Sequence, residues 1–149
     1  MTGIPVSVVP ATPEGRLYPR YQNGIEILTL SSRAPRSCPF GISIDGMILD
    51  FDDGGLLAGV ELRSRLNRGK WKADISRPKG GAGDILLRDP RPGSIECDWP
   101  LRLSFDVQTD AGRIGFGDSD YNRSVELSAG CCALLLDDDL TGFWFTLAR

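Results

Sequence analysis

Apolar and polar residues alternate along much of the chain with a period of two, which is the spacing of half-buried β-strands. The clearest case is segment 101–107, where Leu101, Leu103, Phe105 and Val107 alternate with polar side chains. The polar turn that follows it and the renewed alternation after the turn predict a β-hairpin. No window of eleven or more residues has the 3.6-residue spacing of an amphipathic helix. The pattern therefore predicts an all-β fold.

Further strands are expected where short apolar runs lie between turns rich in glycine, proline and aspartate. The expected segments are 4–9, 24–32, 42–44, 47–51, 56–63, 71–76, 85–88, 94–98, 113–117, 125–127 and 131–136. Gly46 interrupts the phase between two of them, which indicates a bulge or a sharp bend. Some ten to twelve short strands with this turn spacing predict one domain, 1–149, folded as an antiparallel β-sandwich or β-barrel.

Two segments, 42–63 and 125–147, share a pattern in which a strand, an acidic turn, the sequence Leu-x-Gly and an apolar strand follow one another. A duplicated half-domain would produce this pattern, and the fold would then consist of two similar halves. The turn chemistry that hairpins have in common would also produce it. Both explanations stay open.

A chain of 149 residues can bury a core that needs no disulfide or metal to hold it. The sequence contains no histidine, which excludes His-based catalytic triads and zinc sites with imidazole ligands. Cys131 and Cys132 are neighbours on an expected strand and should point to opposite faces. We expect structural thiols. Cys38 is the one candidate for a reactive thiol, because nearby arginines lower a thiol pKa.

The net charge of −3 argues against binding to nucleic acid, which favours a basic protein. The longest apolar run, 131–136, is far shorter than the roughly 20 residues that span a bilayer. Residues 1–10 lack the basic and apolar regions of a secretory signal. These observations predict a cytoplasmic protein with no membrane partner.

Charge is unevenly distributed, with basic residues concentrated in 63–91 and acidic residues in 106–149. The basic segment 63–79 contains Trp71, so RNA binding with the indole as a stacking platform is one hypothesis. The alternative is a solvated loop whose cations balance the acidic part. The acidic part can attract a basic protein partner, or its aspartates can serve turn geometry alone. The candidate partner-binding residues are Asp118, Asp120, Asp137, Asp138 and Asp139.

No motif for phosphate, nucleotide or ester chemistry occurs in the sequence, which has no P-loop, no Gly-x-Gly-x-x-Gly after a strand and no Gly-x-Ser-x-Gly. Asp118-x-Asp120-x-Asn122 begins like a calcium-binding loop. It fails because Arg123 takes the position of the required glycine and Ala129 that of the final glutamate. We therefore assign no catalytic residue, no metal site and no cofactor.

A β-barrel of about eight strands can enclose one small ligand. A second hypothesis is therefore a small-molecule-binding barrel, which could act as a cyclase by confining its substrate. The candidate pocket residues are Trp71, Trp99, Tyr121 and Trp144. The competing explanation is that these aromatic side chains fill the core and its rim.

The hairpin at 44–62 contains the sequence Leu49-Asp-Phe-Asp-Asp-Gly-Gly-Leu-Leu-Ala-Gly-Val-Glu-Leu62. This pattern resembles a small bacterial family of uncharacterised all-β domains, some members of which look like antitoxin partners encoded beside small toxins. The resemblance implies an all-β fold and a non-catalytic role. With the missing catalytic motifs and the acidic C-terminal half, it favours an antitoxin or immunity protein that binds a basic toxin. A homodimer formed through an edge strand also stays open.

Overall fold

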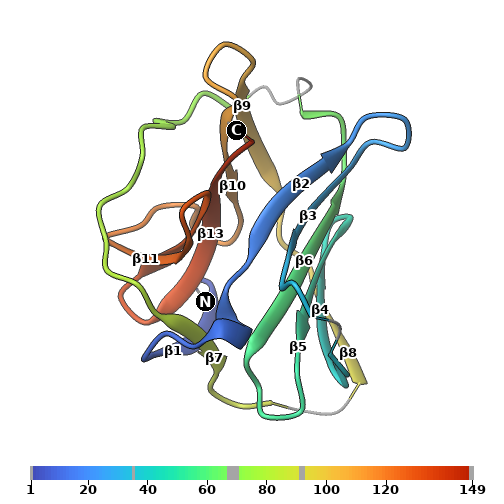
Figure 1. Ribbon diagram of the computed structural model, residues 1–149, viewed down its shortest axis with the longest axis vertical. Coiled ribbons are helices and arrows are strands. Elements are labelled where there is room, and N and C mark those ends of the chain that lie inside the picture. Colours follow the sequence, from blue (N-terminus) through green and yellow to red (C-terminus); the bar gives the residue numbers. More distant parts are fainter. Residues whose placement is uncertain (1, 35, 67–70, 91–92, 148–149) are drawn as a thin grey trace.

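The computed structural model describes residues 2–34, 36–66, 71–90 and 93–147. Over these residues thirteen strands and one short 3₁₀ helix, η1 (Pro13–Gly15), form two sheets that face one another (Figure 1). The predicted all-β sandwich is confirmed. The alternative of a barrel is wrong for the described residues, because their strands remain in two separate sheets.

The first sheet has seven strands, and β13 is its central strand. Its path is β11 (Arg123–Ser128), β12 (Cys131–Leu136), β13 (Asp139–Thr146), β1 (Ile4–Val9) and β7 (Asp84–Leu87), while β10 (Ala111–Gly115) joins β13 to β9 (Arg102–Asp106). β13 pairs with β12 along one edge and with both β1 and β10 along the other. All these pairs are antiparallel, as predicted.

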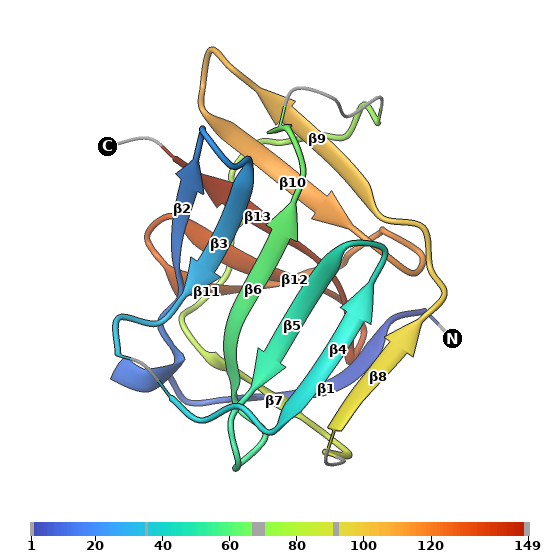
Figure 2. The same cartoon turned by 90° about the vertical axis from the view of Figure 1, so that its right-hand side faces the viewer.

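The second sheet has six strands and lies in front of the first in Figure 2, where β11, β12 and β13 run crosswise behind it. Its order is β2 (Tyr18–Gln22), β3 (Ile27–Ser31), β6 (Leu57–Arg63), β5 (Met47–Phe51), β4 (Phe40–Ile44) and β8 (Gly93–Cys97). The prediction of a wholly antiparallel fold is wrong at one edge, where β8 runs parallel to β4.

The structure also corrects single elements. The strand predicted at 71–76 is not formed, because this segment pairs with no strand and bends at Ser76. Strand β2 was missed because Pro19 interrupts its alternation, although an edge strand tolerates proline. Of the two alternatives at Gly46, the sharp bend is correct and the bulge is wrong. Asp45 and Gly46 both have positive φ, 43° and 87°, and make a two-residue hairpin turn between β4 and β5.

Both sheets contribute to one hydrophobic core. Alternate residues of β12 and β13, such as Cys131 and Phe143, point into it, as does Phe51 of β5. Cys132 and Trp144 occupy the intervening positions and belong to a second, smaller apolar cluster. The two adjacent cysteines therefore face opposite sides of the sheet, as predicted. The continuous apolar run of β12 follows from this burial on both faces.

The two segments with the shared sequence pattern form equivalent structures. Segment 42–63 covers most of β4, β5 and β6, and segment 125–147 covers β11, β12 and β13. Each is a meander of three consecutive antiparallel strands, and each sheet contains one. In both meanders the acidic turn follows the middle strand. This arrangement agrees with duplication and with shared turn chemistry alike, so neither explanation is excluded.

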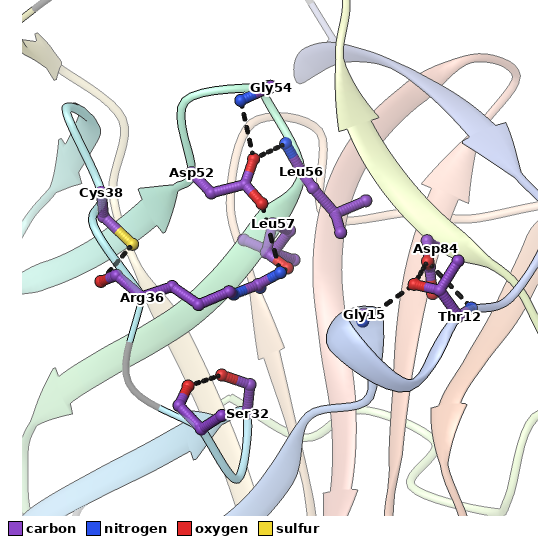
Figure 3. Close-up of polar contacts among 11 residues, drawn as sticks. Thr12, Gly15, Ser32, Arg36, Cys38, Asp52, Gly54, Leu56, Leu57 and Asp84 are labelled. Atoms are coloured by element: carbon purple, nitrogen blue, oxygen red, sulfur yellow. Dashed lines mark hydrogen bonds and ion pairs between the residues drawn. The ribbon is translucent and has the colours of Figure 1, made fainter.

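A buried carboxylate fixes the connection that crosses from the first sheet to the second. Asp84, at the start of β7, is fully buried. Its carboxylate accepts hydrogen bonds from the backbone N–H (3.1 Å) and hydroxyl of Thr12, and it pairs with Arg16 Nη2 at 2.8 Å. A Cβ on Gly15 would lie 1.9 Å from Asp84 Oδ1, so glycine is required there (Figure 3). Arg16 also donates to the carbonyls of Gly83 and Glu126.

The substitution Asp84→Asn should lower the free energy of unfolding by about 3 kcal/mol, because it leaves the Arg16 guanidinium without its charge partner. Urea unfolding measures this loss. Asp53→Asn makes the same chemical change on an exposed turn residue and should cost less than about 0.5 kcal/mol. Equal stabilities of the two variants would show that the Asp84 contacts do not hold the sheets together.

Candidate functional site

The five aspartates predicted to bind a partner gather at one end of the first sheet. Asp137 and Asp138 form the turn between β12 and β13, and Asp139 begins β13. The backbone N–H of Asp118 donates to Thr2 O, and the hydroxyl of Thr2 donates to the Asp139 carboxylate. We call Asp118, Asp120, Asp137, Asp138 and Asp139 the acidic end.

Local hydrogen bonds explain why an aspartate occupies position 137. Asp137 has a positive φ of 56°, and its backbone N–H and carboxylate make reciprocal 2.9 Å bonds with the Asn122 side chain. The carbonyl of Asp120 accepts a bond from the Thr141 hydroxyl. The turn-geometry explanation offered by the sequence is therefore supported for Asp137, whose charge is not neutralised by an ion pair with any described residue.

The charge of the acidic end is only partly neutralised. Asp138 pairs with Arg88 at 3.2 Å, and both side chains are largely exposed, so this contact contributes little. Asp118, Asp120 and Asp137 are exposed and form no ion pair with any described residue. Three carboxylates that form no ion pair with the described residues, from two chain segments, thus share one surface.

The outer face of the first sheet is covered by residues 71–79, which we call the strap. Figure 1 shows the strap in light green, running outside β11 and β13. Trp144 Nε1 donates to the carbonyl of Ile75 at 2.9 Å. The Arg77 guanidinium lies 4.9 Å from the Trp144 ring centre and 3.6 Å from the Glu126 carboxylate. The strap therefore seals the second apolar cluster.

Arg113 is a buried cation that the sequence analysis missed. It is 8% exposed and lies between the rings of Trp71 and Tyr121, at 4.9 and 4.8 Å from their centres. Its guanidinium donates to the carbonyl of Ser119. Burial lowers the pKa of Arg113, and Tyr121, Asp120 and Asp74 oppose that shift. Nothing in the sequence marks it, because an outward-facing arginine on a strand is ordinary until a strap covers it.

The predicted aromatic pocket is not formed. Trp71, Tyr121 and Trp144 lie at the outer face of the first sheet, in or around the second cluster. Trp99 packs instead against the main core, where it stacks on Phe116 at 6.3 Å. The prediction of one pocket is wrong, because it ignored which face of the sheet each ring occupies. The competing explanation, core and rim packing, accounts for all four rings.

The basic segment 63–79 is only partly engaged within the protein, because the three arginines that form ion pairs there have side chains 47–72% exposed. Its arginines form ion pairs at Arg63–Glu61, Arg65–Glu26 and Arg77–Glu126. The Trp71 ring is occupied by Arg113, which removes one of its faces as a stacking platform. Arg68 and Lys70 lie outside the described residues. The structure thus favours charge balance over RNA binding for the part it describes.

The hairpin that carries the family resemblance is organised by Asp52. Its carboxylate accepts bonds from the backbone N–H groups of Gly54 (3.0 Å) and Leu56 (2.9 Å) and pairs with Arg36 at 3.2 Å (Figure 3). Arg36 also reaches the carbonyl of Leu57. These contacts shape a turn and tie it to the segment before β4. Asp52 of the motif therefore has a structural use.

Cys38 does not have the environment of a reactive thiol. Its sulfur lies 3.7 Å from the carbonyl of Arg36 rather than against the guanidinium (Figure 3). Burial and the nearby Asp50 carboxylate raise the pKa of Cys38. Burial also raises the pKa of each of the other three thiols. These surroundings favour a structural thiol over a reactive one at Cys38.

A cleft that the sequence did not reveal opens between the two sheets. Its volume is about 1430 Å³, and its lining includes Tyr18, Arg20, Arg33, Phe105 and Ser128. These residues come from both sheets and share no motif. Only the density of tyrosine and arginine in 18–33 hinted at a surface site.

Two further findings concern other kinds of site. Nowhere in the described ranges do three or more Cys, Asp or Glu residues lie where they could hold one metal ion. No helix among the described residues has the length and apolar character needed to cross a membrane.

No protein-family model matches the chain, and no curated protein matches it either. The resemblance of 44–62 to a bacterial all-β family stays a prediction.

Native thiols should react slowly with iodoacetamide. Because every thiol pKa is raised, we expect each cysteine to be alkylated more slowly at pH 8 than glutathione is. Mass spectrometry of time points assigns the rates. In urea all four thiols should approach the glutathione rate. A native Cys38 that reacts faster than glutathione would restore it as a reactive site.

Trp144→Phe should loosen the strap, because it leaves the Ile75 carbonyl without the indole donor. We expect a loss of about 1–2 kcal/mol in unfolding free energy and faster tryptic cleavage after Lys72 or Lys79. Trp99→Phe is the matched control, since Trp99 stacks in the main core and does not touch the strap. Equal cleavage rates in both variants would contradict this role of Trp144.

Proposed function

We propose that the protein is a non-catalytic binding protein that neutralises a basic protein partner through its acidic end, as an antitoxin or immunity protein does. The observation that carries the proposal is the meeting of Asp118, Asp120 and Asp137 on one surface, where none of them forms an ion pair with a described residue. Reducing conditions suit the four free cysteines, so the proposal includes a cytoplasmic location.

Electrostatics supports a role in recognition. Most ion pairs among the described residues lie in the second sheet, the strap and the crossing connection. At the acidic end only Asp138 has such a pair, so the carboxylates of Asp118, Asp120 and Asp137 stay unpaired there. Such a patch accelerates encounter with a basic protein, from a usual ~10⁵–10⁶ M⁻¹s⁻¹ toward ~10⁸ M⁻¹s⁻¹ or above at low salt. Fast capture suits a protein that must neutralise a harmful partner.

Small-molecule binding remains the second candidate, and the cleft between the sheets favours it. Its catalytic form, a cyclase that confines substrate in a closed barrel, loses support because the sheets do not close. RNA binding through 63–79 loses support because Arg113 occupies one face of the Trp71 ring. A homodimer stays a prediction, for which β8 offers an exposed edge with Ile95 42% exposed.

The test removes charge without changing shape. The triple variant Asp118→Asn, Asp120→Asn, Asp137→Asn keeps the turns, because asparagine tolerates the positive φ at residue 137. The wild-type protein is first used to capture a binding partner from a bacterial extract. At low salt this partner should associate with the triple variant about tenfold more slowly than with the wild-type protein. Surface plasmon resonance measures the rate, and the difference should shrink at high salt.

The control carries the same charge change on the second sheet and its turns, as Asp53→Asn, Glu96→Gln, Asp98→Asn. All three of these residues are exposed. It should bind the captured protein at the unaltered rate. The proposal fails if the two triple variants associate equally fast, or if a lysine-rich peptide shifts NMR signals of the second sheet rather than those of 118–120 and 137–139.

A further inference from the structure

The cleft between the sheets lies where strand β2 faces two turns of the first sheet. One wall contains Tyr18, Arg20 and Tyr21 of β2, and the other contains Phe105 of β9 and residues 128–130 between β11 and β12. Figure 1 shows β2 opposite β13 near the end of the chain marked C. The cleft of about 1430 Å³ shares no residue with the acidic end.

Aromatic rings give the cleft fixed apolar surfaces. Phe105 is held in place because it stacks on Phe145 of the core at 6.0 Å. Tyr21 packs against the same core and is only partly buried. Leu66 and Leu147 extend the apolar lining. A flat or aliphatic group could therefore replace water on these surfaces with little rearrangement of the protein.

The charge of the cleft is opposite in sign to that of the whole chain. Its lining holds Arg20, Arg33 and Arg65 against the carboxylates of Glu26 and Asp110, in a chain of net charge −3. Arg65 is paired with Glu26 at 2.5 Å. Arg33 and Arg20 form no ion pair with the described residues, and the Arg33 guanidinium is stacked 4.3 Å over the Tyr18 ring.

Ser128 is an independent sign of a missing partner. It is 6% exposed and lines the cleft, yet its Oγ has no hydrogen-bond partner among the described residues. Buried hydroxyls are nearly always paired, because burial removes their bonds to water. The register shift between Glu126 and Ser128 places this residue at the β11–β12 turn. An oxygen atom of a bound ligand would satisfy the hydroxyl.

We propose that this cleft binds a small amphipathic anion, a carboxylate or phosphate joined to an aromatic or aliphatic body. The anionic group pairs with Arg33 and Arg20, whose guanidinium groups suit both oxyanions. The body lies on Tyr18, Tyr21 and Phe105. Ser128 donates a hydrogen bond to a ligand oxygen. The proposal does not depend on partner binding at the acidic end.

Calorimetric titration with four probes tests the ligand class. 1-Naphthyl phosphate and 1-naphthoate carry both the anion and the ring, 1-naphthol carries the ring alone, and inorganic phosphate carries the anion alone. We expect a Kd below about 1 mM for at least one of the first two probes, and at least about tenfold weaker binding of the last two. The better of the two naphthyl anions identifies the preferred oxyanion.

Variants test the assigned residues. Arg33→Gln should weaken the affinity of the protein for the better naphthyl anion at least about tenfold. Ser128→Ala should weaken the same affinity about fivefold. Ser128→Ala should also leave the thermal midpoint of the free protein equal or higher, since it removes an unpaired buried hydroxyl. Arg102→Gln, an exposed residue of β9 outside the cleft lining, is the charge-matched control and should bind as the unaltered protein does.

Three outcomes would overturn the proposal. The first is that neither naphthyl anion binds with a Kd near 1 mM. The second is that 1-naphthol binds as tightly as the two anions. The third is that the Arg33→Gln variant binds the better probe as tightly as the Arg102→Gln variant does. A cooperative thermal transition in each variant shows that it is folded, so weaker binding reflects the cleft rather than a lost structure. Failure of the cleft proposal would not count against partner binding at the acidic end, because the two sites share no residue.

Discussion

The buried Asp84 carboxylate is the contact on which the arrangement of this protein depends. Once removed from water it must be matched by the Thr12 donors and the Arg16 guanidinium, and these residues lie on the connection that leaves one sheet for the other. Before that connection, β1 pairs with β13 and its Val6 N–H donates to the carbonyl of Asp138, which supports the acidic end. After it, the chain enters β2, which forms a wall of the cleft. One connection therefore positions both candidate sites.

The fold class could be predicted from the sequence because most strands bury one face, and burial of one face produces alternation. Segment 101–107 illustrates this, since Leu103 is buried while its neighbours on the strand are more exposed. The prediction failed where burial has another cause. Segment 71–76 has apolar positions because it covers the Trp144 cluster, not because it joins a sheet. The parallel pairing of β8 with β4 could not be predicted, since nothing local to either strand specifies a partner that lies so far away in the chain.

The candidate sites differ in how far sequence reasoning reached them. The sequence shows directly which residues are aspartates, and aspartates in turns lie on the surface where strands end. The residues of the acidic end could therefore be predicted together. The aromatic pocket was not, because a ring in a sequence does not show which face of which sheet it will occupy. The cleft depends on the separation of two sheets, and on a hydroxyl at Ser128 that is unusual only once its burial is known. The width of a cleft and the burial of one hydroxyl can be known only from the folded structure.

Amide hydrogen exchange tests most directly whether the Asp84 contacts join the two sheets. The N–H of Thr12 donates to the Asp84 carboxylate, and the N–H of Gly15 donates to Thr12. If the contacts open only when the whole protein unfolds, both amides should exchange as slowly as those of the central strands β12 and β13. Exchange of Thr12 and Gly15 at the rate of exposed loops, while β12 and β13 stay protected, would show that the connection opens by itself and would contradict this account.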